Sequence, residues 1–186
     1  MLTILFLLPI VVGVLSGNIP EQPRVYCGEL PNTIYSCLGN PKIIQPEVSE
    51  KCNKPISECD KTRCIFKESG WAKNNVIDKK KVSDYFEQFA KDNPDWSAAV
   101  QNFKTTCLSD SLKPQGVDTN CPAYDIIHCA LISFIKFASP SQWSTSEQCV
   151  YPRQYAGACP VCPERCFAPS VPNGSCNACL ALLRTP

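Results

Sequence analysis

The sequence predicts an all-α, disulfide-stapled helical domain with irregular extensions rich in cysteine and proline at its N- and C-terminal ends. Three observations lead to this prediction: an apolar N-terminal segment, fourteen cysteines, and a central stretch whose apolar residues recur with helical spacing. The part after residue 17 is long enough to bury one apolar core. We therefore expect one domain over 18–186, made of an N-terminal extension (18–57), a helical core (58–139) and a Cys-rich tail (140–186).

Residues 1–17 have the layout of a signal peptide. They hold no charged side chain, are almost wholly apolar from Ile4 to Leu15, and end in the small residues Ser16 and Gly17. A membrane-spanning helix needs about 20 apolar residues, and this run is shorter. The sequence therefore predicts export and a secreted, extracellular protein.

The cysteines are even in number, which is typical of a disulfide framework in an oxidising compartment. They occupy positions 27, 37, 52, 59, 64, 107, 121, 129, 149, 159, 162, 166, 176 and 179. The N-terminal segment and the cysteine count thus agree on the compartment. Asn173-Gly174-Ser175 is a glycosylation sequon in such a protein, with a glycine turn as the alternative interpretation.

The composition argues against three classes of function. The formal net charge is +1 and no basic run exceeds Lys79–Lys81, so we expect no nucleic-acid partner. One histidine and no Gly-x-Ser-x-Gly or phosphate-binding glycine loop argue against an enzyme or a cofactor. Cys159-x2-Cys162 and Cys176-x2-Cys179 resemble zinc-ligand spacing, but in an oxidising compartment we predict disulfides there and no metal.

In the N-terminal extension, frequent prolines predict extended coil, with a short helix beginning near Pro46 as an option. In the core, Asp78 is placed to cap an amphipathic helix. The apolar positions of that helix repeat every three or four residues, at Val82, Tyr85, Phe86 and Phe89.

Two more helices follow in the core. Asn93 is predicted as the N-cap and Pro94 as the first-turn residue of a helix that directs Cys107 inward. Pro122 opens a long helix to about Ala138 that is too apolar to lie on a surface. From Ser139 onward the composition predicts an irregular tail held by its own disulfides.

The core carries a resemblance to a known family. The residues concerned are Cys64-Ile-Phe-Lys-Glu-Ser-Gly-Trp71, Asp78-Lys-Lys-Lys-Val-Ser-Asp-Tyr85, Asp92-Asn-Pro-Asp-Trp96 and Cys107. This block resembles the insect odorant-binding family (pheromone and general odorant-binding proteins), in its cysteine-rich, C-plus-like branch. The match covers roughly 59–138.

The resemblance implies the disulfides Cys59–Cys121 and Cys107–Cys129, and pairs Cys64 with one of Cys27, Cys37 and Cys52. The family keeps three residues between its second and third cysteines, whereas four lie between Cys59 and Cys64. On an ideal helix this spacing puts the two sulfurs about 140° apart. Either the helix begins between them or the assignment shifts by one.

The function that the resemblance implies is extracellular binding and transport of small hydrophobic ligands, such as odorants or pheromones, in an apolar cavity. Delivery at a membrane receptor and a monomer or weak homodimer fit that role. The candidate lining residues are apolar core positions, for which simple packing is the alternative at every site: Phe66, Trp71, Tyr85, Phe86, Phe89, Trp96, Val100, Phe103, Ile127, Leu131, Phe134 and Ile135.

Two alternatives stay open. His128 is the single histidine. Its titration in acid is one way for a carrier to open, and the other interpretation is a hydrogen-bonded or half-exposed helix residue.

A secreted interaction module, such as a protease inhibitor or signalling factor presenting residues 152–172, is the alternative function of the whole protein. The aromatic-rich core favours the carrier, because an interaction module of that kind does not need it.

Overall fold

The computed structural model describes residues 25, 31–39, 41–54, 57–112 and 121–159. The described part is mostly helical. Its elements, in chain order, are α1 (Ile34–Cys37), α2 (Pro46–Lys51), α3 (Glu58–Glu68), β1 (Ala72–Lys73), β2 (Val76–Ile77), α4 (Lys79–Asp92), the 3-10 turn η1 (Pro94–Trp96), α5 (Ser97–Asn102), the π-helical turn η2 (Phe103–Cys107), α6 (Pro122–Lys136), the 3-10 turns η3 (Pro140–Gln142) and η4 (Glu147–Cys149), and α7 (Val150–Ala158).

Several expectations lie outside the described residues. They are the signal peptide at 1–17, Cys27 as a candidate partner of Cys64, the sequon at Asn173, and the tail from residue 160 onward. Within the described ranges, no helix is long and apolar enough to cross a membrane.

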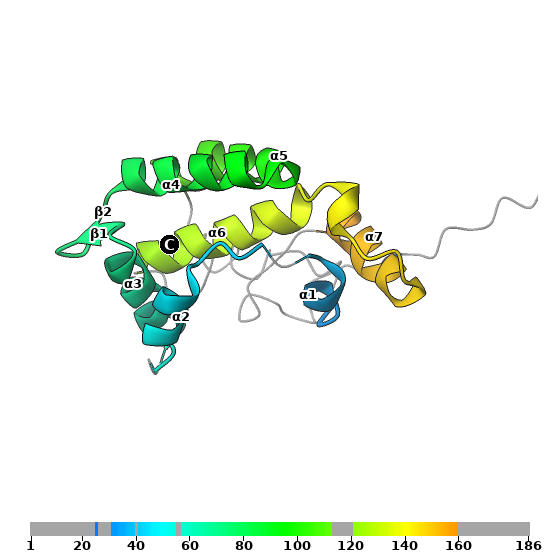
Figure 1. Cartoon of the computed structure of the whole chain (residues 1–186), viewed down its shortest axis with the longest axis horizontal. Helices are drawn as coiled ribbons and strands as arrows, with labels where there is room; N and C mark the ends of the chain where they lie inside the picture. Colours follow the sequence, from blue (N-terminus) through cyan, green and yellow to red (C-terminus); the bar gives the residue numbers. More distant parts are fainter. Residues whose placement is uncertain (1–24, 26–30, 40, 55–56, 113–120, 160–186) are drawn as a thin grey trace, which may run out of the picture.

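Helix α6 is the centre of the domain (Figure 1). It contacts α3 at its beginning, α5 and η2 along its length, and α7 near its end. Helices α4 and α5 run along one side of it, whereas α2 and α3 lie at one end and α1 and α7 at the other. The antiparallel hairpin β1–β2, which the all-α prediction does not contain, connects α3 to α4.

The predicted boundaries of the core helices are largely confirmed. Asp78 caps α4, since its carboxylate accepts a hydrogen bond of 3.1 Å from the Lys81 backbone N–H. Pro122 is the first residue of α6, and Cys107 is fully buried. Asn93 is the N-cap residue and Pro94 the first residue of the turn that follows, as predicted. The Asn93 side chain, however, donates to the Phe89 carbonyl at 2.9 Å and so bonds the end of α4 and not the beginning of the next helix.

The prediction of an irregular tail is wrong for residues 140–159. Val150–Ala158 form α7, and the proline at position 152 fits in the first turn, where a helix needs no backbone N–H donor. Tyr155 and Ala156 are buried against the core. The disulfide Cys37–Cys149 joins this region to α1 across 112 residues, so the tail is held by the N-terminal extension and not only by itself.

The N-terminal extension is more regular than predicted. The short helix beginning at Pro46 is confirmed as α2, and α1 is a further helical turn. The end of α1 and the residue Gly39 bind the segment between α6 and α7: the Gly39 N–H donates to the Gln142 carbonyl at 2.7 Å, and the Ser144 N–H to the Cys37 carbonyl at 2.8 Å. These contacts place residues far apart in the chain side by side.

A connected chain of aromatic rings fills the core. The shortest centroid separation, 4.1 Å, joins Phe86 to Phe103, and the other neighbouring pairs lie between 5.0 and 6.2 Å apart. Contacts of this geometry stabilise beyond the area that they bury. The rings belong to Phe66, Trp71, Tyr85, Phe86, Phe89, Trp96, Phe103 and Phe134.

Gly70 ends α3 in a conformation that suits glycine. Its φ is +71°, its N–H donates to the Lys67 carbonyl at 3.0 Å, and the Trp71 N–H donates to the Phe66 carbonyl at 2.8 Å. This is a Schellman motif, and it directs the chain from α3 into the hairpin. We expect Gly70→Ala to lower the free energy of unfolding by about 1 kcal/mol. Urea unfolding checks this; an unchanged midpoint would contradict it.

Candidate ligand-binding pocket

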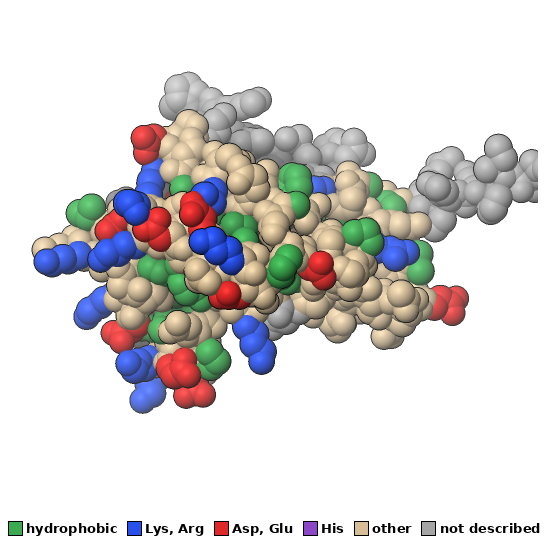
Figure 2. All heavy atoms as spheres, turned by 45° about the horizontal axis from the view of Figure 1, so that its top comes forward, with side chains coloured by type: hydrophobic (Ala, Val, Ile, Leu, Met, Phe, Trp, Pro, Cys, Tyr) green, Lys and Arg blue, Asp and Glu red, His purple; other side chains and the backbone are tan. Residues whose placement is uncertain are grey.

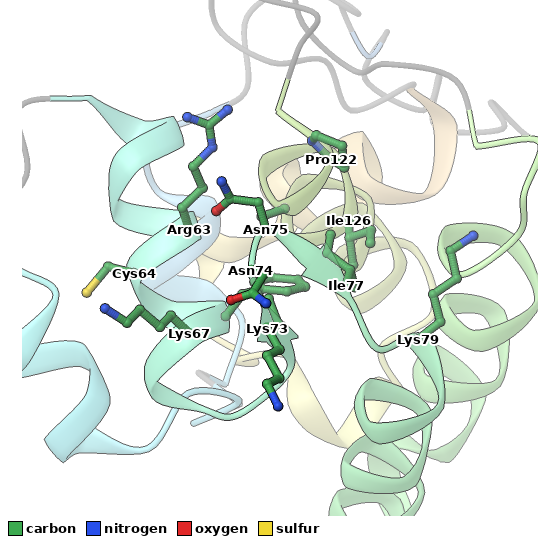
Figure 3. Close-up of a pocket in the computed structure, with 13 residues that line it drawn as sticks. Arg63, Cys64, Lys67, Lys73, Asn74, Asn75, Ile77, Lys79, Pro122 and Ile126 are labelled. Carbon is green, nitrogen blue, oxygen red and sulfur yellow. The ribbon is translucent and has the colours of Figure 1, made fainter.

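An open pocket of about 980 Å³ lies where α3, the hairpin and the beginning of α6 meet (Figure 3). Its apolar walls come from all three of these regions. They are Phe66 on α3, Ala72 and Ile77 on the two strands, and Pro122, Ala123 and Ile126 on α6.

The three regions are held together by covalent and packing contacts around this pocket. The disulfide Cys59–Cys121 joins the first turn of α3 to the residue before α6, and Cys52–Cys64 joins α2 to α3. Phe66 is fully buried and packs edge-on against Trp71 at 5.3 Å. The walls of the pocket therefore belong to the most constrained part of the domain.

Polar side chains surround the apolar walls. Asn74 and Asn75 form the tip of the hairpin, and their φ values of 51° and 63° are those of a two-residue type I′ turn, which asparagine tolerates. Four cationic side chains complete the lining: Arg63, Lys67, Lys73 and Lys79. Among the described residues that line the pocket there is no acidic side chain.

The predicted lining residues are mostly elsewhere. Of the twelve, Phe66 lines this pocket, whereas Phe89 and Trp96 border a more polar hollow of about 520 Å³ near Asp95. Seven others lie in the aromatic core or against it and line neither of these two pockets: Trp71, Tyr85, Phe86, Val100, Phe103, Phe134 and Ile135. Ile127 and Leu131 are partly buried on α6 and pack against the same core.

Most residues around this pocket were not among the predicted ones. Ala72 and Ile77 lie in strands of only two residues, which are too short to show an alternating pattern. Ala123 and Ile126 lie on the face of α6 next to the predicted positions. The pair Asn74-Asn75 was the available signal, because adjacent asparagines favour a tight hairpin turn.

The disulfides resolve the spacing problem at Cys59 and Cys64. Both residues lie on α3, so the helix does not begin between them. Being about 140° apart, their sulfurs face different neighbours: Cys59 bonds Cys121 and Cys64 bonds Cys52. Together with Cys107–Cys129, these are the pairs that the resemblance implies, with Cys52 as the first cysteine.

His128 lies on the partly buried side of α6, not in the lining of the pocket. Its ring stacks on Tyr124 at 5.8 Å, and its buried Nε2 atom has no hydrogen-bond partner among the described residues. Burial lowers the pKa of His128 from 6.5 to about 4, because the charged imidazolium loses solvation. Opening of a carrier in acid through His128 remains a prediction.

The shifted pKa of His128 gives stability a pH dependence. Because the folded-state pKa is about 4, the unfolded chain binds more protons between pH 6.5 and 4, and stability falls as the pH falls through this window. We expect a loss of up to about 3 kcal/mol at pH 4 relative to pH 7. Urea unfolding at both pH values checks this, with His128→Gln as the control in which the loss is smaller; equal losses in both proteins would contradict it.

All nine cysteines in the described ranges are disulfide-bonded, including Cys159 of the zinc-like motif. In that same part of the chain, no group of three or more His, Cys, Asp or Glu side chains gathers in a way that could hold a metal ion. The pocket combines apolar walls with polar side chains at its edge, an arrangement that is typical of small-molecule sites.

Comparisons with known proteins add no family to this description: no protein-family model and no curated protein matches the sequence. The resemblance to the odorant-binding family therefore depends on the residues quoted above.

Proposed function

We propose that this protein binds small hydrophobic molecules in an extracellular fluid and carries them, as the odorant-binding family that it resembles does. The observation that supports this most directly is the open pocket with apolar walls between α3, the hairpin and α6. Its volume of about 980 Å³ is at the upper end of small-molecule sites, which span roughly 300–1,000 Å³.

The order of the disulfides also supports the proposal. Among the cysteines at 52, 59, 64, 107, 121 and 129, the first bonds the third, the second bonds the fifth, and the fourth bonds the sixth. This is the order that the resemblance implies. Four disulfides between described residues also suit an oxidising, extracellular compartment.

Unfilled volume in a small domain has an energetic cost, and disulfides limit the collapse of the surrounding walls while contributing about 2–4 kcal/mol each to stability. Two of the four bridges lie beside the pocket, at Cys59–Cys121 and Cys52–Cys64. These two cross-links hold α2, α3 and the beginning of α6 together around the pocket.

The test is uptake of an apolar fluorescent probe by the oxidised protein, followed by displacement with long-chain alcohols, esters and fatty acids. We expect saturable micromolar uptake and competitive displacement. In Ala72→Phe, a larger side chain occupies the pocket and should weaken uptake at least about tenfold, which corresponds to 1.4 kcal/mol. Ala98→Phe, the same substitution at an exposed site on α5, should bind as the unmodified protein does.

Two results would overturn the proposal. The first is no saturable uptake by protein that is helical by circular dichroism and free of thiols. The second is equal uptake by the unmodified protein and Ala72→Phe, which would place the bound probe elsewhere. A secreted interaction module would then be the better hypothesis, and removal of residues 160–186 would be the next experiment.

A further inference from the structure

We infer that the ligand of the pocket is an anionic amphiphile, a molecule with a hydrocarbon chain and a carboxylate head, in free solution. The inference rests on the proposed function and adds the chemical class of the ligand. It comes from the charge around the apolar walls, which the resemblance does not address.

The rim of the pocket is purely cationic within the described residues. Arg63 and Lys67 come from α3, Lys73 from β1 and Lys79 from the first turn of α4 (Figure 3). The whole chain has 18 Lys and Arg against 17 Asp and Glu, so an average surface region is close to neutral. The described lining of the pocket, with four cationic side chains and no acidic one, differs from that average.

The face carried by α4 and α5 shows the contrast. There, acidic and basic side chains are intermixed (Figure 2). Lys80 forms an ion pair with Asp84 at 2.6 Å, and Lys104 pairs with Glu87. The contact with Lys104 lowers the pKa of the Glu87 carboxyl. Lys80 and Lys104 on that face are therefore compensated by carboxylates of the protein itself.

At the pocket, the positive charges of the lysine side chains are only partly balanced by carboxylates. Lys79 pairs with Asp110 at 2.6 Å and also donates to the Ser109 carbonyl. Lys67 and Lys73, in contrast, have no ion-pair partner among the described residues. The nearest acidic neighbour of Lys67 in sequence, Glu68, pairs with Lys51 instead. Two exposed ammonium groups thus border the apolar walls without a carboxylate of their own.

This arrangement matches both halves of an anionic amphiphile. A hydrocarbon chain lying on the less buried walls, Ala72, Ile77 and Pro122, would leave water, gaining roughly 25 cal/mol for each Å² of apolar surface removed. Lysine stems pack along apolar surface while their ammonium groups stay in water. A carboxylate at the rim would then meet Lys67 or Lys73 without having to enter the apolar part.

The charge predicts an order of affinity among ligands with the same chain. A carboxylate gains both the apolar contact and the ionic one, and a neutral alcohol gains the apolar contact alone. A primary amine of equal length is repelled by the rim. Because the ammonium groups are exposed, salt screens their attraction for the carboxylate.

The experiment compares dodecanoate, dodecanol and dodecylamine, each at concentrations where it is dispersed, as competitors of the fluorescent probe at neutral pH. We expect dodecanoate to displace the probe at the lowest concentration and dodecylamine at the highest. The double variant Lys67→Gln, Lys73→Gln should weaken dodecanoate by about 2- to 20-fold, since an exposed ion pair contributes about 0.2–1 kcal/mol, and leave dodecanol unchanged.

Lys91→Gln is the matched control for the loss of charge. Lys91 is exposed in the last turn of α4, twelve residues and about 18 Å along the helix from Lys79. Its removal should not change the affinity for dodecanoate. Raising the salt concentration should weaken dodecanoate binding in the unmodified protein and have little such effect in the double variant.

Four results would overturn the inference. Dodecanol that binds as tightly as dodecanoate, or a double variant that binds dodecanoate normally, would show that the rim does not select charge. Recruitment to anionic vesicles without uptake of dispersed dodecanoate would assign the rim to a membrane. Probe uptake that falls as protein concentration rises would assign the pocket to a second copy of the chain. Failure of all three competitors and of the probe would instead overturn the proposed function itself.

Discussion

Replacing Phe86 by alanine is expected to lower the free energy of unfolding by about 3–5 kcal/mol. Phe86 has no solvent exposure, and its ring contacts those of Trp71, Tyr85, Phe103 and Phe134. Truncation removes the centre of the aromatic chain and leaves a cavity that these neighbours cannot fill without moving. Urea unfolding with the disulfides intact measures the loss.

The same variant separates the two interpretations of the aromatic stripe. Phe86 does not line the pocket, so folded Phe86→Ala should bind the apolar probe with nearly the affinity of the unmodified protein. Phe137→Ala is the matched control, because Phe137 is 44% exposed and its truncation should cost less than about 1 kcal/mol. Unchanged stability combined with weaker binding would mean that Phe86 is a wall of the ligand site.

This distinction shows where sequence reasoning reached its limit. The positions Val82, Tyr85, Phe86 and Phe89 have the spacing of one helix face, and α4 forms as that spacing predicts. Periodicity reports which face is buried, but a packed ring and a ring beside a cavity give the same pattern. The position of the pocket depends instead on how α3, the hairpin and α6 meet, and this is a property of the tertiary structure.

The local signals succeeded where the physics is local. Asp78 caps α4 because its carboxylate reaches an N–H three residues away. Pro122 begins α6 because a first-turn residue needs no donor. Asn93 shows the limit even of these signals, since an asparagine between two helices can bond to either end, and here it bonds to the preceding one.

Long-range pairing was beyond the sequence for a different reason. Cys149 lies among other cysteines near the C-terminal end, so a local partner was the natural expectation. It bonds Cys37, 112 residues away, because α1 and α7 pack against each other. Cysteine spacing alone does not give connectivity, and the three pairs that agree with expectation were implied by the resemblance.

Removing this disulfide, in the variant Cys37→Ala, Cys149→Ala, is expected to lower the free energy of unfolding by about 4 kcal/mol. The bridge closes a loop of 112 residues. Within that loop, Cys59–Cys121 already joins two residues that are 62 positions apart, so the unfolded chain between Cys37 and Cys149 is shortened by this number. Closing the remaining path of about 50 residues restricts the unfolded chain by about this amount in the chain-entropy treatment. Urea unfolding under non-reducing conditions measures it.

The variant Cys52→Ala, Cys64→Ala is the comparison that tests the reasoning. Its bridge closes a loop of only 12 residues, so the expected loss is smaller, about 3 kcal/mol. Hydrogen exchange shows which helices lose stability. Without Cys37–Cys149, amides of α1 and α7 should exchange faster, whereas those at the pocket end of α6 should keep their protection. A smaller loss for Cys37–Cys149 than for Cys52–Cys64, or faster exchange at the pocket instead, would contradict the assignment. Because the pocket lies at the far end of α6 from this disulfide, the variant should lose stability while its affinity for the apolar probe, if the proposed function holds, stays unchanged.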